Sequence, residues 1–142
     1  MKKIVYLLFL SLFFSCATKK VVSEQKPHDG FDSILSGYQY PFPVSSYAFQ
    51  AQGQNLQMSY MDIRPAGEIK KTVVMFHGKN FGGFYFESIA KELLAKGFRV
   101  VIPDQIGFGK STKPEHFQYS FHLLATLTDH LLKQIGVSEF TL

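Results

Sequence analysis

Two glycine-bearing segments contain residues that can present backbone N–H groups to an anionic atom. The first is Phe76-His77-Gly78-Lys79-Asn80, and the second runs from Asp104 through Gly107-Phe108-Gly109-Lys110-Ser111. Each follows a short apolar run typical of a strand buried on both faces. Open α/β sheets place their ligand sites at the carboxyl ends of such strands, so these two loops are the candidate site.

A nucleotide-binding interpretation of the second loop does not fit its residues. Gly109-Lys110-Ser111 suggests the end of a P-loop, but Asp104 stands where that motif requires a further glycine. The dinucleotide fingerprint G-x-G-x-x-G, begun at Gly107 and Gly109, fails because Thr112 occupies its third glycine position. We therefore expect no nucleotide cofactor.

The two loops together resemble a pair found in α/β-hydrolases, the His-Gly loop and the D-x-x-G-x-G-x-S loop. They occur in the family's order, are separated by one predicted helix, and are followed by a second helix and a strand. The resemblance covers residues 47–142. It implies an enzyme that acts on ester, amide or similar bonds in a small-molecule substrate.

The resemblance also implies roles for the loop residues. In acyl transfer a carbonyl oxygen becomes negatively charged, and preorganised N–H groups stabilise that charge. One such donor is expected from the loop of His77, Gly78, Lys79 and Asn80, at the amide of Lys79 or its neighbour Asn80. We interpret His77 as a residue that holds backbone and transfers no proton. The loop of Asp104, Gly107, Gly109 and Ser111 is expected to be architectural.

No G-x-S-x-G motif, in which the nucleophile of such hydrolases sits, occurs in the sequence. The resemblance places the nucleophile directly after the strand that begins near Phe140, and the acid and the catalytic histidine follow it. All three are therefore expected beyond residue 142, with neither Ser111 nor Asp104 as substitutes. We predict that the chain is an N-terminal fragment, inactive alone; the alternative is a non-catalytic, lipid-anchored binding module on the same scaffold.

The elements that position the loops are predicted as a β-hairpin followed by β-α-β-α-β. The hairpin strands lie near 47–51 and 56–60, with a turn at 53–55. Buried strands are predicted at 72–76 and 98–103, and a third begins at 139. This pattern is typical of the first part of a doubly wound, mostly parallel α/β sheet, left incomplete.

Two helices are predicted between these strands. In the first, the apolar face contains Phe86, Ile89, Ala90, Leu93 and Leu94, and Gly97 ends the helix in a left-handed conformation. The second runs from near Ser120 to Ile135 and stops at Gly136. Its apolar stripe contains Leu124, Thr128, Leu131 and Ile135.

The N-terminus has the layout of an export signal, with Lys2 and Lys3 before an apolar run. Phe13-Phe14-Ser15-Cys16 resembles the lipobox of bacterial lipoproteins, although Phe13 stands where that family usually has Leu. We predict a signal peptide at 1–15, a lipid on Cys16, a tether and lead-in at 16–46, and a partial hydrolase domain at 47–142. The protein is then exported and membrane-anchored in a bacterial cell envelope; the alternative is a soluble secreted or periplasmic protein.

Charge and composition indicate no polyanionic or metal partner. The net charge of +4 falls to +2 when Lys2 and Lys3 leave with the signal (4 − 2), and a mild charge predicts no nucleic-acid binding. His116, His122 and His130 are too dispersed to form a metal set, and surface positions are expected for them. The oligomeric state is not predicted.

Overall fold

The computed structural model describes residues 30–142 of the 142-residue chain. The predicted signal peptide, the lipid-attachment residue Cys16 and the first part of the predicted tether lie outside the described residues. Those assignments therefore stay predictions. Within residues 30–142, no helix has the length and apolar character needed to cross a membrane.

The described residues form four strands, one short 3-10 helix and two α-helices. In chain order they are β1 (Ser45–Ala51), β2 (Gln54–Ile63), β3 (Lys71–Val74), η1 (Gly83–Phe86), α1 (Glu87–Ala95), β4 (Phe98–Pro103) and α2 (Phe121–Gln134). This order confirms the predicted hairpin followed by alternating strands and helices.

The four strands form one mixed sheet in the order β1-β2-β4-β3. Pairing is antiparallel between β1 and β2 and between β2 and β4, and parallel between β3 and β4. The third predicted parallel strand is present as a single bridge, in which Thr141 pairs with Val73. The Val74 N–H donates to the Thr141 carbonyl at 2.8 Å. Residue 141 thus lies beside β3, on the side away from β4.

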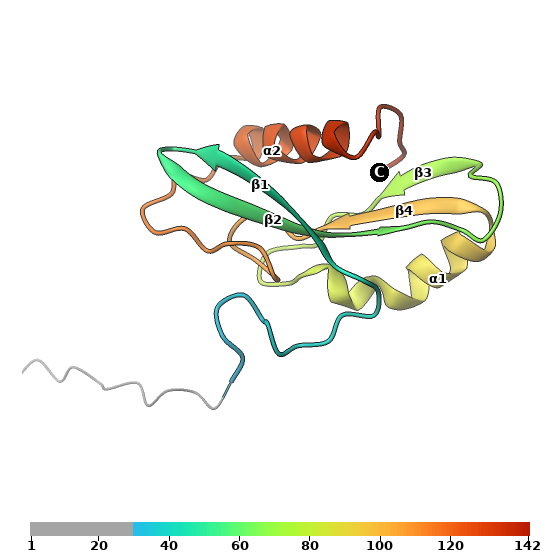
Figure 1. Ribbon diagram of the computed structural model, residues 1–142, viewed down its shortest axis with the longest axis horizontal. Coiled ribbons are helices and arrows are strands. Elements are labelled where there is room, and N and C mark those ends of the chain that lie inside the picture. The colour runs from blue at the N-terminus through green and yellow to red at the C-terminus, as the bar shows by residue number, and fades with distance from the viewer. Residues whose placement is uncertain (1–29) are drawn as a thin grey trace, which may run out of the picture.

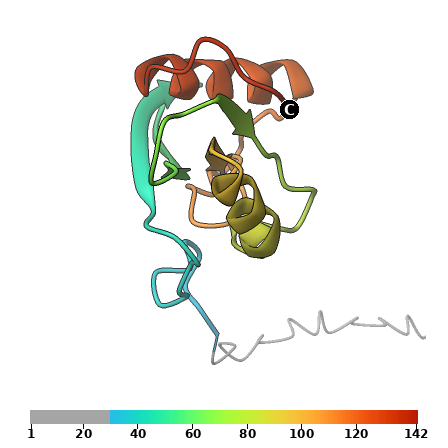
Figure 2. The same ribbon diagram turned by 90° about the vertical axis from the view of Figure 1, so that its right-hand side faces the viewer.

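The two helices cover opposite faces of the sheet, with α2 above it and α1 below it in Figure 1 and again in Figure 2. Successive residues of a strand point to opposite faces, and β4 follows this rule. Val100 and Ile102 pack in the core that contains Ala90 of α1, whereas Val101 packs with Leu132 of α2. This arrangement confirms the predicted doubly wound architecture.

Local signals set the helix ends where they were predicted. The Ser120 side chain caps α2 by accepting a hydrogen bond from the Leu123 N–H at 3.1 Å. Gly136 follows α2 with φ of 70°, and the Val137 N–H reaches back to the Leu132 carbonyl at 2.8 Å. Gly97 follows α1 in the same left-handed region, with φ of 87°.

The hairpin turn lies one residue earlier than predicted. Ala51 pairs with Gln54, so the turn consists of Gln52 and Gly53. Their φ values of 49° and 72° are both positive, which is the geometry of a type I′ turn. This turn matches the twist of the flanking strands, and the advantage outweighs the strain of placing Gln52 in the left-handed region.

Two apolar residues predicted to be in the core are exposed. Ile89, assigned to the buried face of the first helix, is 53% exposed, because Ala90 provides the closest contact between α1 and the sheet. Phe76 was assigned to a buried strand and is 41% exposed. The strand β3 ends at Val74, so Phe76 lies past the sheet rather than inside it.

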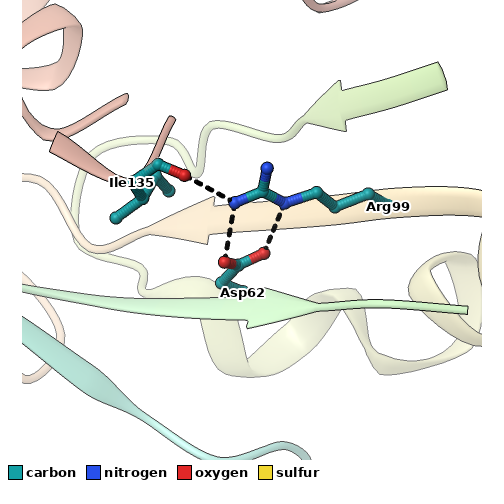
Figure 3. Close-up of polar contacts among 3 residues, drawn as sticks. All are labelled: Asp62, Arg99 and Ile135. Carbon is teal, nitrogen blue, oxygen red and sulfur yellow. Dashed lines mark hydrogen bonds and ion pairs between the residues drawn. The ribbon is translucent and has the colours of Figure 1, made fainter. Parts of the chain in front are cut away.

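A buried ion pair joins the sheet to the end of α2 (Figure 3). The guanidinium of Arg99 on β4 donates two hydrogen bonds of 2.8 Å to the carboxylate of Asp62 on β2. Its Nη2 atom also donates to the Ile135 carbonyl at 3.1 Å. The hydrogen bonds to Asp62 raise the pKa of Arg99 further above its already high ordinary value. Arg99 therefore stays charged and ties β2, β4 and the end of α2 together.

Candidate active site

His77 joins the two glycine-bearing loops at the carboxyl ends of β3 and β4. The residue is 8% exposed, and its Nε2 atom lies 2.8 Å from the backbone nitrogen of Gln105. A backbone N–H can only donate, so Nε2 is the acceptor and the ring proton sits on Nδ1. Nδ1 then donates to the Gly78 carbonyl at 2.8 Å. Both ring nitrogens are engaged with backbone, which is the geometry of a positioning residue.

The loop after His77 makes a tight turn, in which the Phe81 N–H donates to the Gly78 carbonyl at 3.3 Å. Asn80 occupies the third position of this turn with φ of 66°, the conformation of a type II turn. Lys79 and Asn80 are exposed, and among residues 30–142 neither of their backbone N–H groups has a protein acceptor. Both donors are therefore available to an anionic atom of a ligand.

Asp104 is the centre of the second loop. The residue is 1% exposed, and its carboxylate has no ion-pair partner in the described part of the chain. Oδ2 accepts from the backbone N–H of Lys110 and from the Tyr40 hydroxyl, each at 2.7 Å. Oδ1 accepts from the backbone N–H of Gly83 at 2.6 Å. Three donors thus replace the hydration that the carboxylate loses on burial.

Tyr40 belongs to the lead-in before β1, which is bound to this loop rather than separate from it. Besides the Tyr40 hydrogen bond to Asp104, the Lys110 ammonium donates to the Leu35 carbonyl and lies 5.1 Å from the centre of the Tyr40 ring. Burial, followed by the hydrogen bond to Asp104, raises the pKa of Tyr40. The phenol therefore stays protonated and continues to donate to the carboxylate.

Glycine is required at two positions of the second loop. Gly107 and Gly109 have φ of 94° and 51°. A Cβ on Gly109 would lie 2.2 Å from the Asp104 carboxylate, and one on Gly107 would lie 2.6 Å from the Tyr119 hydroxyl. The left-handed conformation disfavours a side chain at both positions, and at Gly109 the buried Asp104 carboxylate also leaves no space for one, whereas the half-exposed Tyr119 can move away from Gly107.

Ser111 holds the base of the second loop. Its side chain is fully buried, donates to the Asp104 carbonyl at 2.6 Å and accepts from the backbone N–H of Ser59 at 2.8 Å. Lys113 donates to the carbonyls of Gly109 and Ser111, and burial lowers the pKa of its ammonium group. A serine with this burial and these partners does not offer a nucleophile to a ligand.

A cavity of about 750 Å³ lies between the two loops and α2. Its polar contacts come from His77, Lys79, Gln105, Thr128 and Asp129. The remaining lining is mostly apolar and includes Phe76, Phe108, Tyr119, Phe121, Leu124, Leu132, Phe140 and Leu142. Lys79, whose amide has no acceptor among residues 30–142, therefore lines a mostly apolar pocket that is open to solvent.

The three other histidines of residues 30–142 take no part in this arrangement. His116, His122 and His130 are exposed. Within the described residues, no group of three or more His, Cys, Asp or Glu side chains is placed to hold a metal ion.

A sequence profile of the alpha/beta hydrolase fold matches residues 71–142, which is half of the chain and includes both loops. The chain belongs to the α/β-hydrolase family. Its predicted fold class is thereby confirmed, and the mixed sheet with a helix on each face is the N-terminal portion of that fold.

The relatives of this member of the α/β-hydrolase family are named for several activities. It is 38% identical over 105 residues to a haloalkane dehalogenase of Mycobacterium marinum, covering 72% of this chain and 35% of that protein. It is 31% identical over 91 residues to a cis-3-alkyl-4-alkyloxetan-2-one decarboxylase of Xanthomonas campestris, covering 58% of this chain and 29% of that protein.

Solved structures give the same family. The crystal structure of a probable hydrolytic enzyme from Pseudomonas aeruginosa superposes with a TM-score of 0.75 at 41% identity, covering 78% of this chain and 35% of that one. An esterase from Exiguobacterium antarcticum superposes with a TM-score of 0.57 at 27% identity, covering 68% and 34%. The chain thus spans about a third of the length of the proteins it matches.

The structure brings the two predicted loops together and adds residues that the sequence did not single out. Gln105 donates its backbone N–H to His77, and its side chain donates to the Thr128 hydroxyl at 3.0 Å, which links the loop to α2. Tyr40 contacts Asp104 across 64 residues of chain. Thr128 was on the predicted apolar stripe of its helix, but no local signal marked Tyr40 or Gln105.

Proposed function

We propose that the whole protein is a hydrolase of ester, amide or similar bonds in which the Lys79 amide is one of two oxyanion-hole donors. The observation that supports this most directly is the turn at Gly78–Phe81, which leaves the N–H groups of Lys79 and Asn80 without protein acceptors among residues 30–142, and Lys79 lines the mostly apolar cavity. Donors of this kind stabilise an oxyanion more than the neutral carbonyl, so they lower the barrier rather than only binding substrate.

The proposed reaction begins with attack of a nucleophile on the substrate carbonyl. Negative charge develops on the carbonyl oxygen, and the Lys79 N–H donates a hydrogen bond to it, with the Asn80 N–H as the neighbouring candidate. We place the nucleophile after the strand that Thr141 begins, and the second donor, the acid and the catalytic histidine also beyond residue 142. His77 keeps the loop in place and transfers no proton.

Haloalkane dehalogenation is a second candidate, because a haloalkane dehalogenase is among the relatives at 38% identity. The mostly apolar lining of the cavity suits an alkyl group as well as an acyl chain. In that reaction the anion to be stabilised is a departing halide, which N–H donors also bind. A non-catalytic binding module on the same scaffold is the alternative to both.

Lys79→Pro tests the donor directly, because proline lacks the backbone N–H. Lys79 is the second residue of its turn, a position that proline favours, so the turn is retained. Lys79→Ala is the matched control, since it removes the ammonium group but keeps the amide. The whole protein is assayed with p-nitrophenyl butyrate, a p-nitroanilide and 1-bromobutane.

We expect Lys79→Pro to lower kcat by about 100-fold to 1,000-fold, the usual effect of losing one oxyanion donor, and Lys79→Ala to lower it far less. Equal kcat values for the two variants would exclude the Lys79 amide as a donor. Halide release without ester or anilide cleavage would favour the dehalogenase, and no turnover of any of the three substrates would favour the binding module.

We also propose that the protein is exported and anchored by a lipid on Cys16, on the basis of its N-terminal sequence. Mass spectrometry of the mature N-terminal peptide from the membrane fraction is expected to show a diacylglyceryl group on Cys16. The Cys16→Ser variant cannot carry this lipid, so we expect it to be lost from the membrane fraction when cell fractions are compared. An unmodified Cys16 in a soluble envelope fraction would favour the secreted or periplasmic alternative.

A further inference from the structure

The loop that contains Lys79 and Asn80 is fixed at both of its ends by two consecutive residues. At its start, His77 Nε2 accepts from the backbone N–H of Gln105 at 2.8 Å. At its other end, the backbone N–H of Gly83 donates to the Asp104 carboxylate at 2.6 Å. Between these anchors the loop is held to itself at the Gly78 carbonyl, which accepts from the Phe81 N–H at 3.3 Å and from His77 Nδ1 at 2.8 Å. The direction of the Lys79 and Asn80 amides therefore depends on where Asp104 and Gln105 lie.

Asp104 can hold Gly83 only while its own carboxylate keeps its position. The carboxylate is buried without an ion-pair partner, and two of its three donors are backbone N–H groups. The third is the hydroxyl of Tyr40, the only side chain among them. Tyr40 precedes residues 71–142, the part of the chain that the family profile matches.

The Tyr40 hydroxyl also lies against the loop itself. A Cβ built on Gly82 would be 2.9 Å from that oxygen and 3.0 Å from the Gly109 Cα. The hydroxyl thus fills the space between Gly82 and the second loop while it donates to Asp104. A phenylalanine would keep the ring and remove both the hydrogen bond and this contact.

We propose that Tyr40 is a positioning residue, which acts through Asp104 and Gly83 to aim the backbone N–H groups of Lys79 and Asn80. The effect of Tyr40 on catalysis rests on the proposed function, whereas its effect on the conformation of residues 78–83 does not. Without the hydroxyl, the carboxylate turns toward its remaining donors, the bond to Gly83 loosens, and residues 78–83 sample more conformations.

Hydrogen–deuterium exchange of the whole protein tests the structural step. Tyr40→Phe is compared with Tyr38→Phe, a matched control in the same lead-in and the same cluster of aromatic rings, whose hydroxyl has no hydrogen-bond partner among residues 30–142. We expect Tyr40→Phe to speed exchange in peptides that cover 78–86 by about tenfold or more, because tenfold corresponds to roughly 1.4 kcal/mol, close to the low end for one hydrogen bond to a charged group. Exchange in the β1–β2 hairpin is expected to stay unchanged.

Equal exchange of 78–86 in the two variants would overturn the proposal, and so would equally faster exchange over the whole domain, because that would indicate general destabilisation. Asp104→Asn provides a second check, since a residue that acts through Asp104 has little further effect once the carboxylate is gone. The proposal would also be contradicted if Tyr40→Phe, added to Asp104→Asn, sped exchange in residues 78–86 by the same factor as it does in the unmodified protein.

Ester hydrolysis by the whole protein then tests the catalytic step. A misaimed oxyanion donor weakens transition-state binding more than substrate binding, so Tyr40→Phe should lower kcat several-fold with little change in KM, and Tyr38→Phe should change neither. A rise in KM at constant kcat would refute the aiming role. Absence of turnover in the unmodified protein would count against the proposed function, while the exchange result would still decide the role of Tyr40.

Discussion

Replacing Arg99 by leucine should destabilise the protein far more than a change at a surface charge. The side chains of Arg99 and Asp62 are 7% and 19% exposed, and two hydrogen bonds of 2.8 Å join them. Leucine fills part of the space but leaves the Asp62 carboxylate poorly solvated and without its partner. It also leaves the Ile135 carbonyl without its donor.

Removing one partner of a buried ion pair costs about 3 to 5 kcal/mol. The residual exposure of Asp62 lets water reach the carboxylate, so the lower end, about 3 kcal/mol, is expected for Arg99→Leu. Replacing both partners by leucine removes the unpaired charge as well as the attraction. The double variant should therefore lie within about 1 kcal/mol of the unmodified protein.

Urea unfolding of the whole protein, followed by circular dichroism, measures these differences. Lys133→Met is the control, because the Lys133–Asp129 pair is exposed and such pairs contribute less than about 1 kcal/mol. If Arg99→Leu shifts the midpoint no more than Lys133→Met, or if the double variant is as unstable as the single one, the unpaired carboxylate is not the source of the cost.

Three further outcomes are expected. Gly109→Ala should lower the melting temperature much more than Gly136→Ala, since both glycines have positive φ but only Gly109 has the Asp104 carboxylate 2.2 Å from an added Cβ; similar losses would show that backbone conformation alone requires glycine. Ser111→Ala should cost about 2 kcal/mol in urea unfolding because it leaves a buried backbone N–H and carbonyl without their partner, while Ser138→Ala at an exposed site should be near neutral. Folding raises the pKa of Tyr40, so the unfolded chain releases this proton at a lower pH than the folded protein does. The stability that this difference contributes is present below about pH 10 and is lost as the pH rises above it. Tyr40→Phe should therefore reduce the fall in the free energy of unfolding at alkaline pH, and an unchanged slope would contradict the raised pKa.

The sequence predicted those parts of the fold that local chemistry determines. Ser120 as a cap and Gly97 and Gly136 as left-handed stops are signals within one turn of the helix ends that they set. The alternation in β4 follows from strand geometry alone. Periodicity was less informative at Ile89, because it groups residues on one face without saying how much of that face the sheet covers.

The contacts that define the candidate site, and the ion pair that supports the sheet, join distant parts of the chain. Tyr40 reaches Asp104, Gln105 reaches Thr128, and Arg99 reaches Asp62, across separations of 64, 23 and 37 residues. None of these pairs has a spacing rule that a single sequence reveals. The site loops were found through their resemblance to a family, whereas the residues that hold them required the structure.

The anchoring of residues 77–83 by consecutive residues has a consequence for protein engineering. Asp104 and Gln105 hold the two ends of the loop, and their Cα atoms are one peptide apart, about 3.8 Å. This spacing does not depend on the length of the loop between the two ends. Residues inserted between Asn80 and Phe81 lengthen the loop without separating its attachment points. Since doubling a loop costs only about 0.6 kcal/mol of closure entropy, this segment can carry loops of different length at little cost in stability, although an insertion there replaces the Gly78–Phe81 turn that presents the Lys79 amide.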